Sequence, residues 1–222
     1  MENNPGHEEK FSPWWKNAVI LVLIFGFSIL VWLAVRSYKD APPIADAIVD
    51  TSGNTIFTGD DIRSGQEVFL KYGLMQNGTV WGHGAYLGPD YSARYLHQQT
   101  LDSYDFLAQQ KYGTDWAAVT TEQKDIILAE VARETRINTY DPVANTLTLN
   151  DMQTFSFERQ QEEWRHFFSE PAHNFGLPDT YINDETELRQ LVAFFFWTSW
   201  ASSTNRPGKD FSYTTISPIT LK

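Results

Sequence analysis

The chain has 222 residues, which suits one domain or one domain with an appendage and excludes a large multidomain protein. It carries 17 Lys and Arg against 28 Asp and Glu, a net charge of −11. Such an acidic chain is a poor nucleic-acid binder, because phosphate contacts need clustered basic residues. Cysteine is absent, which excludes disulfides, thiolate zinc sites, iron–sulfur clusters and thioether-attached c-type haem.

The first element is an uncharged, apolar run at residues 17–35. A hydrocarbon core of about 30 Å needs about 20 helical residues, so the run predicts a transmembrane helix over residues 17–38. A cleaved signal peptide, the alternative, has a shorter apolar run and a small-residue cleavage site, which this sequence does not offer. Two basic residues lie close to the run on each side, so charge alone leaves its orientation open.

Short elements follow. Residues 48–49 and 56–57 are apolar and flank Thr51-Ser52-Gly53-Asn54, which predicts a β-hairpin. Thr58 is expected to cap the next helix, with Asp61 in its first turn. The loop after this helix contains five glycines and ends in a proline, namely Gly73, Gly78, Gly82, Gly84, Gly88 and Pro89. Glycine at this density indicates special backbone angles or a close approach of the backbone to another group.

The rest of the chain reads as helices and one more hairpin. In chain order, we expect helices over residues 90–112 and 121–136, a hairpin over 137–149, and a helix over 151–168 capped by Asn150, with Met152, Phe155, Trp164, Phe167 and Phe168 inside. Asn183-Asp184 opens a last helix that becomes almost wholly apolar at residues 191–203. That stretch is short for a membrane span, so we expect a buried or interfacial helix.

Two Glu-x-x-His pairs have the spacing of a carboxylate-bridged di-iron site, Glu163 with His166 and Glu170 with His173. Pro171 interrupts the second pair, so a helical geometry is not expected there. We therefore interpret these side chains as the solvated face of an amphipathic helix. The sequence contains no P-loop, dinucleotide-binding or nucleophile-elbow motif.

Five segments of the chain form a distinctive set, namely SGQEVF (64–69), YGLM (72–75), TVWGHGAYLGPD (79–90), YLH (95–97) and ASSTNRPGKD (201–210). Together they resemble the N-terminal region of quinol-dependent nitric oxide reductase, and the similarity runs from about Trp14 to Tyr213. In that family the region is similar to the cytochrome c subunit of the cytochrome-dependent enzyme, fused ahead of the catalytic membrane part.

The resemblance implies a cytochrome c fold without its haem. The haem subunit carries a Cys-x-x-Cys-His motif shortly before a Gly-Glu-Gly-Ala-Tyr loop, which here reads Gly-His-Gly-Ala-Tyr at residues 82–86. By alignment, the two cysteines fall on Leu74 and Asn77 and the axial histidine on Gly78. Without thiols and an axial imidazole, neither covalent attachment nor ligation is expected.

The implied organisation has four parts, all within a mainly α fold with small β-hairpins. They are a cytoplasmic N-terminus (1–16), a transmembrane helix (17–38), a periplasmic haem-less cytochrome c-like domain (39–209) and a divergent tail (210–222). The implied location is the bacterial inner membrane, with lipid around the helix. The family continues into a catalytic bundle, so we interpret this chain as a truncated, split or frame-shifted member, or a deliberately cut piece.

The implied function is the non-catalytic N-terminal part of a denitrification enzyme that reduces two NO to N₂O with quinol electrons. Its expected partner is the catalytic membrane region, in the same or a separate chain, where b-type haem, non-haem iron and calcium reside; this chain alone is expected to hold no cofactor. By residue match, the Gly84 carbonyl and the Tyr86 side chain would help to ligate the calcium, only when docked. Two alternatives remain: a stand-alone membrane-tethered interaction module, and a glycine loop that is merely a turn packed by Trp81 and Tyr86.

Overall fold

The computed structural model describes residues 12–170 and 174–215, and the chain divides into two compact units after residue 41. The first unit contains helix α1 (Pro13–Asp40), which begins at the N-cap Ser12 and ends in an extended residue, Ala41. Its 28 residues give a length of about 42 Å. Among the described residues, α1 is the one helix long and apolar enough to cross a membrane, and it extends beyond the predicted residues 17–38 at both ends.

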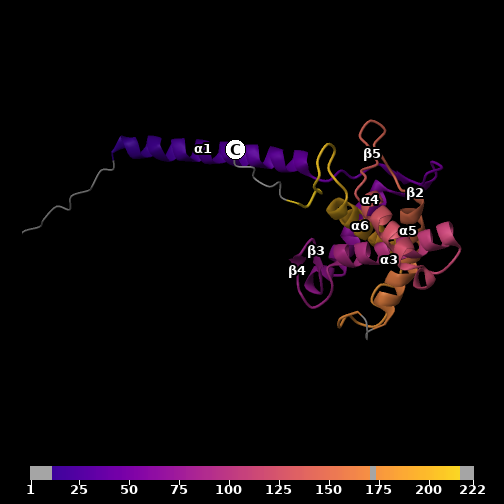
Figure 1. The fold of residues 1–222 in the computed structure, drawn as a ribbon. Helices are drawn as coiled ribbons and strands as arrows, with labels where there is room; N and C mark the ends of the chain where they lie inside the picture. The colour runs from indigo at the N-terminus through magenta and orange to yellow at the C-terminus, as the bar shows by residue number, and fades with distance from the viewer. Residues whose placement is uncertain (1–11, 171–173, 216–222) are drawn as a thin grey trace, which may run out of the picture. The chain divides into compact units, whose positions relative to one another are not determined.

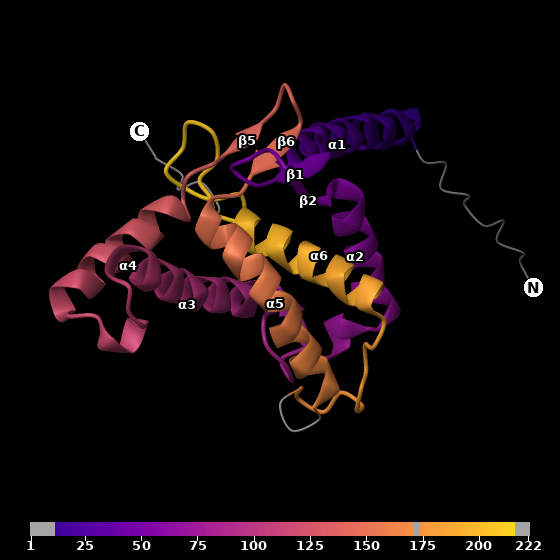
Figure 2. The same ribbon diagram turned by 90° about the vertical axis from the view of Figure 1, so that its right-hand side faces the viewer.

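The second unit starts at Pro42 and is mostly helical (Figures 1 and 2). Its helices are α2 (Gly59–Lys71), α3 (Tyr91–Tyr112), α4 (Thr121–Glu134), α5 (Asp151–Ser169) and α6 (Glu185–Ser203). Short 3₁₀ turns lie at Leu74–Gln76 and Trp116–Ala118. The predicted caps Thr58 and Asn150 are confirmed, and each forms a reciprocal capping box with the third residue of its helix.

In the described part of the chain, six short strands form two sheets. They are β1 (Ala47–Val49), β2 (Thr55–Thr58), β3 (Thr79–Val80), β4 (His83–Gly84), β5 (Tyr140–Asp141) and β6 (Thr146–Thr148). Both predicted hairpins, β1–β2 and β5–β6, are confirmed as antiparallel pairs. They join through a parallel pairing of β1 with β6, Ala47 opposite Thr146, into one sheet of order β2-β1-β6-β5.

Helix α6 is the centre of the second unit. It packs on α2, α3 and α5, and Figure 2 shows it flanked by α2 on one side and α5 on the other. Eleven of its residues are buried, which confirms the prediction of a buried helix. Its aromatic side chains join those of α3 and α5, with the Tyr91 and Phe195 rings stacked at 5.0 Å and Trp164 4.6 Å from Phe195.

A smaller core lies between α3, α4 and the start of α5, around Leu107, Ile127, Val131 and Met152. Here one prediction was wrong. Phe155 is only half-buried, with its ring 5.3 Å from that of Phe106 on α3, whereas Phe157, two residues later, is fully buried against Phe57 of β2. The burial follows the helix face that α6 and the sheet cover.

Candidate functional site

The glycine loop lies between α2 and α3 and folds as a small hairpin. Strand β3 pairs with β4, with Val80 opposite His83, so the turn consists of Trp81 and Gly82. Both turn residues have positive φ, 53° and 76°, as the two-residue hairpin turn that matches strand twist requires. A bulky residue at positive φ is uncommon, and packing must stabilise it.

Trp81 is stabilised by α6. Its indole Nε1 donates to the Thr198 carbonyl at 2.8 Å, and its ring lies 5.6 Å from that of Trp197. Trp197 in turn donates its Nε1 to the Pro43 carbonyl at 2.9 Å. The hairpin is therefore connected to the central helix by an indole.

Asp90 joins the hairpin to α3. One carboxylate oxygen accepts hydrogen bonds from the Thr79 hydroxyl and the Gly82 backbone N–H, both at 2.7 Å. The other oxygen accepts from the Ala93 N–H at 2.9 Å and caps α3. Sequence reasoning placed Asp90 only at the start of a helix. Its contacts with residues eight and eleven positions earlier depend on the hairpin, which local pattern did not reveal.

Asn77 organises the inner side of the loop. Its side-chain oxygen accepts from the Tyr91 hydroxyl at 3.0 Å, and its side-chain nitrogen donates to the Phe175 carbonyl at 3.0 Å. Burial raises the pKa of the Tyr91 phenol well above its usual value, so the phenol is a hydrogen-bond donor at neutral pH. Gly88 N–H donates to the Asn77 carbonyl at 2.6 Å.

The positions aligned with a haem-binding motif do not fit a haem. Leu74 is fully buried in the core, and Asn77 is a buried polar link with no thiol. At Gly78, a side chain would begin 2.2 Å from the Pro89 carbonyl oxygen and 2.7 Å from the Tyr91 ring. No axial imidazole could be accommodated there, because backbone and a packed aromatic ring fill that direction.

The two predicted calcium ligands lie at the outer edge of the hairpin. Gly84 has a φ of 140°, and a side chain there would begin 2.3 Å from the Gly78 carbonyl oxygen. Tyr86 is 86% exposed, and its hydroxyl donates to the Gly82 carbonyl at 3.3 Å. Trp81 therefore packs against α6, whereas most of the Tyr86 side chain is exposed. Leu87, beside Tyr86, is also exposed.

The described histidines and the described residues of the two Glu-x-x-His pairs are dispersed. His83, His97 and Glu163 are exposed, and His166 Nδ1 lies 3.3 Å from a carboxylate oxygen of Glu170, four residues later. His173 lies outside the described residues. Within residues 12–170 and 174–215, no three His, Asp or Glu side chains converge as a metal site would need.

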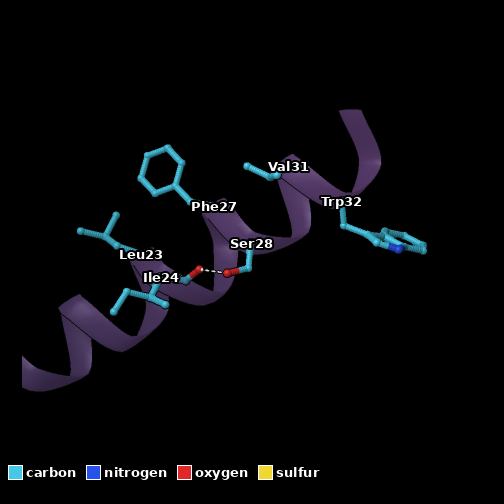
Figure 3. A pocket seen from close by; sticks show the side chains of 6 residues that line it. All are labelled: Leu23, Ile24, Phe27, Ser28, Val31 and Trp32. Carbon is cyan, nitrogen blue, oxygen red and sulfur yellow. Dashed lines mark hydrogen bonds between the residues drawn. The ribbon is translucent and has the colours of Figure 1, made fainter. Parts of the chain in front are cut away.

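The described residues also form grooves and clefts away from the glycine loop. Shallow apolar grooves follow α1, one of them lined by residues from Leu23 to Trp32 with the Ser28 hydroxyl bonded to the Ile24 carbonyl (Figure 3). A polar cleft lies where the ends of α4 and α6 meet the middle of α3.

Comparison with known protein families identifies the family of the chain. A family model that describes the NorB cytochrome c-like domain of nitric oxide reductase matches residues 45–218. The chain belongs to this family. The match begins after α1 and includes residues 210–218, which lie in the segment expected to diverge. Among curated proteins, no match reached significance.

Proposed function

We propose that this chain is the non-catalytic N-terminal part of a quinol-fed nitric oxide reductase and that it docks on the catalytic membrane region through its glycine hairpin. Membership of the NorB domain family supports a place in such an enzyme. The single observation that carries the docking role is the hairpin itself: Asp90 and Trp81 fix its backbone, while Tyr86 and Leu87 remain largely exposed.

The chain has no electron-carrying role in this proposal. The positions of a haem-binding motif are occupied by Leu74, Asn77 and Gly78, and the space around them contains packed side chains. An enzyme that takes electrons from membrane quinol does not need a haem in this domain to accept them from a soluble cytochrome. In this proposal, Leu74, Asn77 and Gly78 instead maintain the packing beneath the hairpin.

The proposed location is the bacterial inner membrane. Helix α1 has the length and composition of a single span, and the described acidic residues that follow it would lie on the periplasmic side. Trp14 and Trp15 near one end and Tyr38 near the other suit the two interfaces, where aromatic side chains are enriched.

Calcium enters the proposal only after docking. The Gly84 carbonyl and the Tyr86 phenol oxygen are hard donors, but calcium takes six to eight oxygen ligands. The catalytic region would supply the others, so the isolated chain would bind calcium negligibly. When bound there, the ion would join the two parts and offset nearby negative charge.

Two measurements on the purified full chain test the non-catalytic role. We expect no quinol-driven NO consumption above buffer, and no c-type band in a pyridine haemochrome spectrum of protein made with the c-type maturation system. Turnover by the chain alone, or a stoichiometric c-type band, would contradict the proposal.

The docking role is tested in the assembled reductase. We expect Tyr86→Phe to lower calcium retention and NO turnover, whereas Tyr112→Phe, at the far end of α3, leaves both unchanged. If Tyr86→Phe and a Tyr86→Ala, Leu87→Ala double variant both assemble with full calcium and activity, the hairpin is not the docking element. Loss of assembly in the double variant alone would assign docking to the apolar contact without calcium.

A further inference from the structure

The polar cleft has a composition unlike the rest of this acidic protein. It measures about 390 Å³, which is within the range of small-ligand sites. Three helices line it, namely α3 through Leu96, Thr100 and Tyr104, α4 and its C-cap region through Val131, Ala132, Thr135 and Arg136, and α6 through Ser202 and Ser203. These described residues contribute one cation and five hydroxyl groups but no carboxylate, although the chain has a net charge of −11.

Arg136 provides the positive charge of the cleft. In the described ranges, its guanidinium has neither an ion pair nor a hydrogen bond, whereas Arg133, three residues earlier, pairs with Glu134 at 2.9 Å. A guanidinium presents five donors in a planar fork that matches carboxylate and phosphate groups. Arg136 is therefore equipped to bind an anionic group at the mouth of the cleft.

The hydroxyl groups of the cleft act as hydrogen-bond acceptors, whereas the guanidinium acts as a donor. Thr100 and Thr135 donate their protons to backbone carbonyls of residues four positions earlier at 2.7 Å, and Ser202 and Ser203 donate theirs to the Ser199 carbonyl at 2.8 and 2.9 Å. Because these protons are engaged, the oxygens present lone pairs to a ligand. Helices α4 and α6 also both end here, and helix C-termini favour positive charge.

We propose that this cleft binds a small zwitterion, with its anionic group on Arg136 and a primary ammonium on the hydroxyl oxygens. Phosphoethanolamine has this chemistry, either as a free molecule or as the headgroup of a phospholipid. Its phosphate suits the guanidinium fork, and its three N–H donors suit acceptors whose own protons are engaged. The site is independent of the proposed docking hairpin and of calcium.

The test titrates phosphoethanolamine into the full chain in detergent micelles and follows the side-chain Nε–Hε signal of Arg136 by NMR with isotope-labelled arginine. The signal is assigned by its loss in Arg136→Gln. Phosphocholine is the matched probe, because it keeps the phosphate and the positive charge but has no N–H donor. We expect phosphoethanolamine to bind about fivefold more tightly than phosphocholine, as one or two hydrogen bonds would allow.

Variants separate the two halves of the site. Arg136→Gln should weaken phosphoethanolamine binding about tenfold or more, measured by the ligand phosphorus signal, and Arg136→Lys should weaken it less. Arg133→Gln, which removes the same charge from outside the cleft, should leave the affinity unchanged. A Ser202→Ala, Ser203→Ala double variant should bind the two probes equally.

The proposal is overturned if the wild-type chain binds phosphocholine as tightly as phosphoethanolamine, or if Arg136→Gln binds phosphoethanolamine like the wild type. It is also overturned if no signal moves with either probe. Nanodiscs then distinguish the source of a bound ligand. If phosphatidylethanolamine in the disc suppresses binding of free phosphoethanolamine, the site takes a lipid headgroup; if it does not, the site takes a soluble molecule.

Discussion

One carboxylate, that of Asp90, joins a hairpin turn, a strand and a helix. It accepts from the Gly82 N–H, the Thr79 hydroxyl and the Ala93 N–H at once, so two backbone donors and one hydroxyl depend on it. The oxygen facing the hairpin is distinct from the one that caps α3. Substitutions at Asp90 can therefore measure separately how much the residue stabilises the α3 cap and how much it stabilises the hairpin.

We expect Asp90→Asn to keep the helix cap and to weaken the hairpin, because an amide nitrogen facing Gly82 and Thr79 offers them no acceptor. Hydrogen exchange at the Gly82 amide should accelerate while exchange at Ala93 is unchanged. Asp90→Ala should accelerate exchange at both and destabilise the fold by about 1–2 kcal/mol. Protection of Gly82 in Asp90→Asn would show that the carboxylate is not what holds the turn.

Asp102 on α3 is almost completely buried against α5. Its carboxylate accepts from the Ser156 hydroxyl at 2.7 Å and from the Gln98 amide at 3.2 Å, and Arg159 Nε lies 3.4 Å away. Burial raises the pKa of this carboxyl above its ordinary 3.8, although these partners oppose the shift. The protonated form is therefore favoured by folding, and that stabilisation is lost as pH rises through the folded-state pKa.

Asp102→Asn removes this titration and keeps the shape of the side chain. Relative to the wild type, the free energy of unfolding of this variant should increase as pH rises from below 3.8 towards neutrality, measured by denaturant unfolding in micelles. If the difference in free energy of unfolding between wild type and Asp102→Asn stays constant across this pH range, burial does not raise the pKa of Asp102.

At the scale of elements, the contact of α2 with α6 depends on Gly65. A side chain at this position would begin 2.0 Å from the Gln190 carbonyl oxygen and 2.8 Å from the Phe194 Cβ. The obstructing atoms are backbone and the root of a packed side chain, so they cannot move aside without separating the helices. Glycine here allows α6 to lie in contact with the α2 backbone.

We expect Gly65→Ala to destabilise the fold by about 1–3 kcal/mol, despite the better helix propensity of alanine. The free energy of unfolding measures this, and near-ultraviolet circular dichroism should report altered packing of the aromatic core. Ser64→Ala, the half-buried neighbour on α2, should change stability by no more than about 0.5 kcal/mol. Equal stabilities of the two variants would mean that α2 and α6 tolerate a wider separation.

The elements themselves were largely predictable, because their signals are local. Thr58 and Asn150 cap helices through residues three positions away, and the β1–β2 and β5–β6 turns lie within a few residues of their strands. The parallel pairing of Ala47 with Thr146 was not predictable, since nothing near either strand specifies a partner so distant in sequence.

In the candidate site, too, local features could be predicted from the sequence and long-range contacts could not. Glycine density located the loop, but the hairpin within it requires a positive φ at Trp81, and a bulky residue gives no such signal in sequence. What stabilises Trp81 is the Thr198 carbonyl, more than a hundred residues later. The cleft at Arg136 also escaped prediction, because its hydroxyls come from three helices and their flanking residues.

At the scale of the whole molecule, the orientation in the membrane is the decisive prediction. Because the chain contains no cysteine, a single introduced thiol reports one position. A cysteine at Asp115, which is exposed, should react with a membrane-impermeant maleimide in intact spheroplasts, and one at Asn3 should not. Both should react after the membrane is opened. The reverse pattern in intact spheroplasts would place the acidic domain in the cytoplasm.

The hydrogen bond from Trp197 to the Pro43 carbonyl has a consequence for biosynthesis. The two residues are 154 positions apart. Strand β1 likewise pairs with β6, which is synthesised much later than β1. At a synthesis rate of about 5–20 residues per second, Pro43 precedes Trp197 on the ribosome by about 8–30 s. Strand β1 can pair with β2 at once, but its other edge and the Pro43 carbonyl stay without their partners until β6 and α6 have been made, and chaperones could protect these groups during that time.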